Sequence, residues 1–140
     1  MKDIITNIAM RKLDNDDLLR FTRHFSLNEI GQEGQEKLKN ARVLVIGAGG
    51  LGSPLLIYLA AAGIGTIGIV DDDLVSVTNL QRQILYTTAE VGTKKVENAS
   101  LKLRALYPEI EILKYDLRLN EENAESIMRD FDVVADCSDN

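Results

Sequence analysis

The amino-acid sequence predicts an α/β fold: a Rossmann-like, doubly wound, mainly parallel sheet preceded by an N-terminal helical segment. Two observations support this prediction. Four apolar segments alternate along the chain with segments of helical pattern, and alternation of this kind produces a parallel sheet with right-handed crossovers. The first apolar segment also runs into the glycine-rich stretch GAGGLG at 47–52, and a glycine-rich turn between a strand and a helix is typical of a phosphate-binding loop.

The composition favours one compact domain in the cytoplasm. The chain has 140 residues, of which 45% are hydrophobic, enough for a sizeable core. No segment approaches the roughly 18 apolar residues of a membrane span, and the N-terminus lacks the pattern of a secretory signal. The net charge of −6 gives no bulk attraction to nucleic acid or to an anionic membrane, so we expect neither as a partner.

The first 40 residues are polar and helical in pattern. The stretch DNDDLLRFTRHF at 14–25 predicts a helix with Asp14 or Asn15 as its N-cap, and the stretch GQEGQEKLKN at 31–40 predicts a second short helix. We therefore divide the chain into an N-terminal helical segment, 1–40, and a nucleotide-binding, Rossmann-like half-domain, 41–140.

Four strands follow from the apolar pattern. The run RVLVIG at 42–47 is apolar without alternation, as expected of a parallel strand that is buried on both faces. Further strands are predicted at 66–71, 109–119 and 132–137, each after a helical or polar segment.

Three helices alternate with these strands. The stretch at 52–63 predicts the first, and the stretch at 93–107 predicts the second, with Thr93 as its cap. The third is predicted at 120–131, with Asn120 as its cap.

Two segments depart from a minimal strand–helix plan. Residues 72–92 form a long connection between the second strand and the next helix, and ligands bind at loops that follow the carboxyl ends of parallel strands. The sequence stops at DCSDN, directly after the fourth strand and at the same edge of the sheet. Because a ligand should bind there, we expect this sequence to be the N-terminal part of a longer protein, truncated after the fourth strand.

The glycines match the pattern G-x-G-x-x-G in the context that this motif requires. In that pattern Gly47 makes the tight turn, Gly49 lets a phosphate approach the backbone, and Gly52 lets the helix pack closely on the strand, while Gly50 is an additional glycine. Asp71 ends the second strand 19 residues after Gly52, close to the spacing of a carboxylate that binds ribose hydroxyls. These features alone fit a dinucleotide cofactor and ATP equally well.

A second polar cluster follows the loop and favours a site that breaks a triphosphate. Arginine and lysine neutralise phosphate oxygens, asparagine and glutamine hydrogen-bond them, and a carboxylate such as Asp139 can hold Mg²⁺. A protein that only holds a dinucleotide does not need such a cluster. Its members are Asp72, Asp73, Asn79, Gln81, Arg82, Gln83, Lys94 and Lys95.

The sequence also lacks the residues for several kinds of covalent catalysis. The chain has one cysteine, Cys137, so it cannot form an intrachain disulfide. Because this cysteine lies on a predicted buried strand and the one histidine, His24, precedes the first strand, we expect neither a Ser-His-Asp nor a Cys-His set. A nucleophile that is already ionised needs no histidine or other general base to activate it. The C-terminal carboxylate of a peptide, with a pKa of about 3.3–3.7, is such a nucleophile and could attack the α-phosphate of ATP.

Five motifs in order, from about Leu18 to Asn140, resemble the ThiF/MoeB/HesA family, bacterial relatives of the ubiquitin-activating enzymes. The run from Asp71 to Thr88 resembles the thiamine-pathway branch more than the molybdopterin branch. The motifs are RFTRH, GAGGLGSP, DDDLVSVTNLQRQILYTT, KKVENA and DCSDN. The resemblance implies that ATP and Mg²⁺ are used to adenylate the C-terminal glycine of a ubiquitin-like sulfur-carrier protein, with release of pyrophosphate. It also implies that structural zinc ligands and a sulfur-handling cysteine lie beyond Asn140.

The resemblance further implies a role for each matching residue. Gly50 would lie against the α-phosphate and Asp71 would bind the ribose. The triphosphate would be held by Asn79, Arg82 and Lys95, with Gln83 in support and Asp73 beside them. At the end of the chain, Asp139 would bind Mg²⁺ and Asn140 would lie near the nucleotide.

Arg23 would reach into the site from the partner subunit of a homodimer, as an arginine finger. The family usually has glutamine where this chain has His24 and threonine where it has Ser138. Cys137 matches the structural cysteine of the last strand, not the reactive one. We expect His24 to be a surface or interface residue without a ligand.

Three other interpretations compete with adenylation. An NAD-dependent oxidoreductase explains the glycines and Asp71 but leaves Arg82 and Lys95 without a function. A non-catalytic scaffold of the same family should lack the arginine or aspartate positions, and they are present. A related branch acts on transfer RNA, and the acidic composition argues against it.

Overall fold

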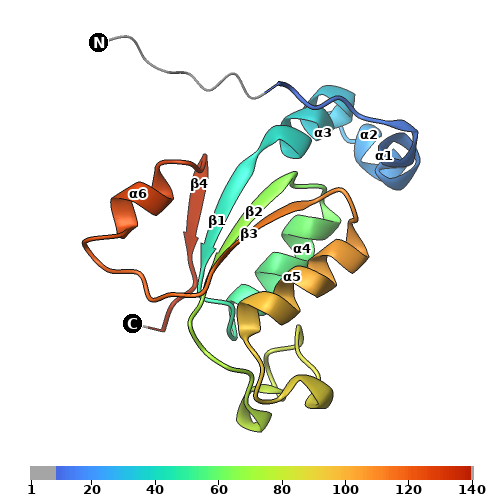
Figure 1. The fold of residues 1–140 in the computed structure, drawn as a ribbon. Helices are drawn as coiled ribbons and strands as arrows, with labels where there is room; N and C mark the ends of the chain where they lie inside the picture. The colour runs from blue at the N-terminus through green and yellow to red at the C-terminus, as the bar shows by residue number, and fades with distance from the viewer. Residues whose placement is uncertain (1–8, 140) are drawn as a thin grey trace, which may run out of the picture.

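The computed structural model describes residues 9–139, which form a parallel, four-stranded sheet with helices against both faces (Figure 1). The strands are β1 (Arg42–Ile46), β2 (Thr66–Val70), β3 (Glu111–Tyr115) and β4 (Val133–Asp136), in the order β3-β2-β1-β4. This arrangement confirms the predicted doubly wound, Rossmann-like sheet. The division of the chain at residue 40 into two parts stays a prediction.

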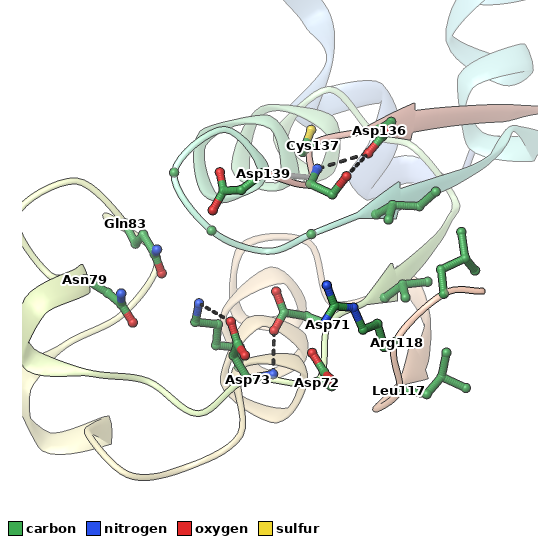
Figure 2. A pocket seen from close by; sticks show the side chains of 18 of the residues that line it. Asp71, Asp72, Asp73, Asn79, Gln83, Leu117, Arg118, Asp136, Cys137 and Asp139 are labelled. Carbon is green, nitrogen blue, oxygen red and sulfur yellow. Dashed lines mark hydrogen bonds and ion pairs between the residues drawn. The ribbon is translucent and has the colours of Figure 1, made fainter.

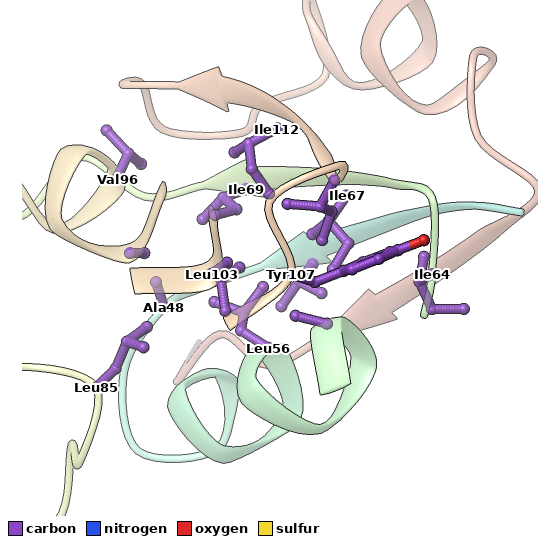
Figure 3. Packing of buried hydrophobic residues seen from close by; sticks show 14 of the residues in the cluster. Ala48, Leu56, Ile64, Ile67, Ile69, Leu85, Val96, Leu103, Tyr107 and Ile112 are labelled. Carbon is purple, nitrogen blue, oxygen red and sulfur yellow. The ribbon is translucent and has the colours of Figure 1, made fainter. Parts of the chain in front are cut away.

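The sheet separates two apolar layers because successive side chains of β1 point to opposite faces. Val43 and Val45 pack on the side of α4 (Gly52–Ala61) and α5 (Lys95–Leu106), in the larger buried cluster (Figure 3). Leu44 and Ile46 pack on the other side, where α6 (Ala124–Met128) contributes Ile127. Burial on both faces explains why β1 lacks the polar–apolar alternation of an exposed strand.

The N-terminal helices lie at the amino end of the sheet, away from the carboxyl ends of its strands (Figure 1). They are α1 (Asn15–Arg20), α2 (Thr22–Phe25) and α3 (Gly31–Asn40). Asp14, one of the two predicted N-caps, caps α1 in a reciprocal capping box, but the single helix predicted over 14–25 is interrupted at Phe21. The helices are fastened to the core by Asp17, which is fully buried and bonds both Lys39 of α3 and the Tyr107 hydroxyl at the end of α5.

Three boundary predictions are wrong for identifiable reasons. Strand β3 is shorter than 109–119 because its ladder to β2 spans only Glu111–Tyr115. Thr93 does not cap α5, since its hydroxyl donates to the Glu90 carbonyl, and Lys94 is the N-cap. Asn120 accepts the amides of Glu122 and Asn123 and thereby stabilises a turn, so α6 begins only at Ala124.

The long connection after β2 has local structure of its own. It contains the 3-10 turns η1 (Val77–Asn79) and η2 (Thr88–Glu90), each closed by a capping box. Leu85, between them, is buried in the larger apolar cluster (Figure 3). The connection is therefore a fixed part of the domain. Within residues 9–139, no helix is both long and apolar enough to cross a membrane.

Candidate nucleotide-binding site

A cavity of about 530 Å³ lies at the carboxyl ends of the strands, where a doubly wound sheet binds its ligand. Figure 2 shows residues from the end of β2, the connection after it and the end of β4 facing one another across this cavity. Ten of the predicted site residues line it. They are Gly47, Gly49, Gly50, Asp71, Asp73, Asn79, Arg82, Gln83, Lys95 and Asp139.

Two glycines of the loop are required by geometry. Gly47 has a φ of 90°, and a Cβ there would lie 2.8 Å from the Cys137 carbonyl oxygen. A Cβ on Gly52 would lie 1.9 Å from the Gly47 carbonyl oxygen, so this glycine permits the close contact of helix and loop. Gly52 does not line the cavity and acts through packing, as the motif predicts.

Two carbonyl groups of the loop are engaged within the protein, whereas two of its amides are not. The Ala48 carbonyl accepts the Tyr86 hydroxyl, and the Gly49 carbonyl accepts the Ser53 amide. No acceptor in residues 9–139 receives the N–H groups of Gly49 or Gly50. Free backbone amides at the start of a helix form a favourable site for an anion such as a phosphate.

Asp71 is fixed by backbone hydrogen bonds to both of its carboxylate oxygens. Figure 2 shows the bond from the Asp73 amide. Oδ2 accepts the Ala48 amide at 2.9 Å, and Oδ1 accepts the Asp73 amide at 2.8 Å. Each oxygen keeps a second lone pair, so the carboxylate can also accept hydroxyl groups of a ligand. Asp71 therefore links the glycine loop to the end of β2.

The two amide side chains of the cluster have different environments. Asn79 uses its Oδ1 to accept the Ser76 amide at 3.0 Å and close η1, which leaves its NH₂ group for a ligand. Gln83 is 4% exposed, and its Oε1 has no hydrogen-bond partner among the described residues. Its Nε2 lies 3.3 Å from the position of a Cβ on Gly49, so this side chain is pressed against the glycine loop.

Lys95 and Arg82 bring positive charge to the same wall of the cavity. Lys95 is buried at the first residue of α5, and its Nζ lies 3.6 Å from Oδ2 of Asp73. Arg82 donates to the Thr78 carbonyl at 3.1 Å, and its Nε lies 3.7 Å from the position of a Cβ on Gly50. Both cations can therefore neutralise phosphate oxygens held by the loop.

Carboxylates outnumber cations around the cavity, which is lined by five aspartates and three basic residues. The carboxylates of Asp71, Asp72 and Asp73 lie within 4.8 Å of one another, and Asp139 follows β4. Hard oxygen donors of this kind are what Mg²⁺ requires. A triphosphate adds further negative charge to this acidic cavity, so a divalent cation fits both the donors and the charge.

Sequence reasoning missed Arg118 and an apolar part of the lining. Figure 2 shows Arg118 and Leu117 on the side of the cavity away from Asn79 and Gln83. No hydrogen bond or ion pair within residues 9–139 involves the Arg118 side chain. The lining also includes Leu119, Met128 and Val134. Leu117, Arg118 and Leu119 were missed because the sequence predicted a third strand as far as residue 119, whereas they lie in the loop after β3.

Arg23 does not line the cavity. It lies on α2, at the amino end of the sheet, whereas the cavity lies at the carboxyl end (Figure 1). A role for Arg23 in a site of the partner subunit stays a prediction. Its neighbour His24 is half-buried and bonds Gln35 at 2.7 Å, which gives it a packing role within its own chain. Asn140 lies outside the described residues.

Cys137 has the surroundings of a structural residue. Its amide donates to the Ile46 carbonyl at 2.7 Å, and its side chain packs against the larger apolar cluster. Burial, followed by the charge of Asp136, raises the pKa of the thiol, which disfavours the reactive thiolate. Asp136 in turn has a lowered pKa because it accepts hydrogen bonds from the Ser138 hydroxyl and amide.

The fold and the cavity define a nucleotide-binding α/β domain. It combines a glycine-rich phosphate loop with a polar cluster of Asn79, Arg82, Gln83 and Lys95. The chain belongs to the ThiF family, whose family model matches residues 21–140.

Curated relatives include several named adenylyltransferases. The chain is 50% identical over 125 residues to a sulfur carrier protein adenylyltransferase of Thermus thermophilus, covering 89% of this chain and 46% of the relative. It is 48% identical over 128 residues to the probable adenylyltransferase/sulfurtransferase MoeZ of Mycobacterium tuberculosis, covering 91% and 33%. The chain thus spans between a third and a half of the length of these relatives.

Solved structures of similar fold also exceed this chain in length. The tRNA N6-threonylcarbamoyladenosine dehydratase TcdA of E. coli, in complex with ATP, is 30% identical with a TM-score of 0.88, covering 93% of this chain and 53% of that one. The E. coli protein MccB is 32% identical with a TM-score of 0.73, covering 82% and 35%.

Proposed function

We propose that the protein uses ATP and Mg²⁺ to adenylate the C-terminal glycine carboxylate of a ubiquitin-like sulfur-carrier protein. The observation that carries this proposal is the free amides of Gly49 and Gly50 in one cavity with Arg82 and Lys95. A cofactor that is only held does not need these cations near its phosphates. The names of the relatives, which include a sulfur carrier protein adenylyltransferase, support the same reaction.

The reaction requires positioning and charge neutralisation more than proton transfer. Asp71 holds the ribose, and the amides of the glycine loop bind the phosphates. A carboxylate oxygen of the carrier attacks the α-phosphorus, the bond to the bridging oxygen of the β-phosphate breaks, and pyrophosphate leaves with the bonding electrons. Arg82 and Lys95 neutralise the charge that develops on the leaving group.

Asp139 would hold Mg²⁺ through its carboxylate oxygens, and the carboxylates of Asp72 and Asp73 line the same cavity. The ion would supply charge neutralisation for the triphosphate as pyrophosphate departs. Removal of divalent cations with a chelator should therefore abolish adenylation.

We further propose that the sulfur carrier belongs to the thiamine pathway rather than to the molybdopterin pathway. The run from Asp71 to Thr88 favours a thiamine-pathway carrier. Relatives also include a probable molybdopterin-synthase adenylyltransferase of Porphyra purpurea, 46% identical over 125 residues. Both carriers end in a glycine carboxylate that suits the reaction, so comparing them as substrates at equal concentration will choose between the two pathways.

The choice of nucleotide tests the proposal without a carrier. Calorimetry on the intact protein should detect binding of ATP in the presence of Mg²⁺ and no preference for NAD. Arg82→Ala with Lys95→Ala should weaken ATP binding, whereas substitution of the exposed Arg104 to alanine should leave it unchanged. Tight binding of NAD without binding of ATP would overturn the adenylation proposal and favour an oxidoreductase.

A further inference from the structure

The residue between the first two glycines of the loop is held from both sides. Ala48 is fully buried and does not line the cavity. Its amide donates to Oδ2 of Asp71 at 2.9 Å, and its carbonyl accepts the Tyr86 hydroxyl at 2.7 Å. One carboxylate and one phenol therefore fix the backbone from which the free amides of Gly49 and Gly50 extend.

Tyr86 comes from the long connection after β2, which also supplies the second wall of the cavity. Its backbone amide donates to the Gln83 carbonyl at 3.2 Å, so it is joined to the segment that bears Arg82 and Gln83. Its neighbour Leu85 is buried in the same apolar cluster as Ala48 (Figure 3). The Tyr86 hydroxyl thus connects the long connection after β2 to the glycine loop, on the buried side of the cavity.

The environment keeps the phenol protonated. Tyr86 is 4% exposed, and burial, followed by the negative charges of Asp71 and Glu90, raises its pKa well above the ordinary value. The hydroxyl therefore remains a donor to the Ala48 carbonyl at neutral pH. Tyr86 does not line the cavity, so it acts on a ligand only through the loop.

We propose that Tyr86 is a positioning residue, which holds the Ala48 carbonyl away from the cavity so that the next two amides face the phosphates. If the hydroxyl of Tyr86 is removed, the buried Ala48 carbonyl loses the hydrogen bond that it accepts from this hydroxyl. The peptide group of Ala48 is then free to rotate. The inference rests on the proposed function only in taking ATP as the ligand. The positioning of the glycine loop by Tyr86 does not depend on which ligand binds.

The test is Tyr86→Phe in the intact protein, which removes only the hydroxyl. Hydrogen exchange without nucleotide should report its loss at two hydrogen-bonded amides of the loop, those of Ala48 and Ser53. Relative to the unaltered protein, exchange at these loop amides should be accelerated about 5- to 30-fold more than exchange at the amides of Val45 and Ile69. Binding of ATP with Mg²⁺ should weaken by about the same factor, seen as a higher Kd and a higher KM for ATP.

Tyr107→Phe is the matched control, because its hydroxyl is also buried and donates at 2.7 Å to Asp17 at the opposite end of the core. It should leave loop exchange and ATP binding as they are in the unaltered protein. Equal acceleration of loop and core amides in Tyr86→Phe, or no acceleration, would overturn the positioning role. If the unaltered protein does not bind ATP, the proposed function fails, and the exchange comparison still decides the role of Tyr86.

Discussion

At the scale of single residues, Asp71 already has a structural function before a nucleotide binds, because both of its oxygens accept backbone amides. Asp71→Ala should weaken ATP binding by about 1.5–3 kcal/mol, the range for hydrogen bonds to a charged group. Asp71→Asn should be nearly as severe, since its NH₂ group must face one of the two backbone N–H donors. Calorimetry measures both effects, and substitution of the exposed Asp130 to asparagine is the control.

Unchanged ATP affinity in a folded Asp71→Ala variant would contradict this account. That result would mean that Asp71 ends the strand but does not bind the nucleotide.

Arg82 separates the chemical step from binding. It is expected to face charge that develops as pyrophosphate leaves, and arginines in such positions contribute about 10³–10⁵ in rate in other phosphoryl-transfer enzymes. A smaller loss is expected for Arg82→Ala because Lys95 and Mg²⁺ share the work. The kcat for ATP–pyrophosphate exchange should fall sharply while the Kd for ATP changes modestly. A large loss of affinity with unchanged kcat would assign Arg82 to binding alone.

The sequence predicted which residues line the site better than it predicted the hydrogen bonds that these residues make. The spacing of the glycines and Asp71 follows a motif with a known mechanical reason, so these residues could be found in advance. That Asn79 closes its own turn and that Gln83 has a buried, unpaired oxygen depend on tertiary structure. Tyr86 could not be found from the sequence because its role is a contact with a backbone atom 38 residues away.

At the scale of elements, the N-terminal helices are joined to the sheet through a buried charge. Asp17 bonds Lys39 and Tyr107, and Lys39 has a second partner in Glu109 at 3.0 Å. Asp17→Ala should lower the free energy of unfolding by about 3 kcal/mol, the low end for breaking a buried ion pair, since Glu109 still pairs with Lys39. Urea unfolding measures this loss, and ATP affinity in the folded variant should not change. A loss below about 0.5 kcal/mol, typical of a surface site, would contradict the anchoring role.

Helix α2 provides a test of assembly through Arg23. This residue lies at the end of the sheet opposite its own cavity, so a catalytic role requires a second subunit. Arg23→Ala and Arg82→Ala should each lower exchange activity. Mixing the two variants with subunit exchange should restore up to about a quarter of the activity, because half of the dimers then contain one site with both arginines.

No recovery after mixing, with subunit exchange demonstrated by an independent label, would exclude an arginine finger. Mixing two samples of the Arg82→Ala variant is the control, and it should recover nothing.

The error at the end of the third strand shows the limit of local pattern. The pattern extended β3 beyond its actual end, because the apolar residues Leu117 and Leu119 continued it. These residues instead line the cavity or pack beside it. The strand ends where pairing with β2 ends, and pairing is a tertiary property that local pattern does not determine.

At the scale of the whole molecule, the parallel, doubly wound sheet and the ligand site at its carboxyl edge were predictable, since strand–helix alternation and the glycine loop leave few topologies. The chain is acidic, with a net charge of −6, and its cavity is lined by more carboxylates than cations. Both properties suit a nucleotide bound with a divalent cation better than a polyanionic RNA.

The measurement that tests the central claim most directly is ATP–pyrophosphate exchange on the intact protein with a purified sulfur carrier. Labelled pyrophosphate should enter ATP only when Mg²⁺ and a carrier with a free C-terminal glycine carboxylate are both present. The same carrier with an amidated C-terminus should support none, because the nucleophile has been removed. Tight binding of NAD together with no exchange from any carrier that has a free carboxylate would contradict the account.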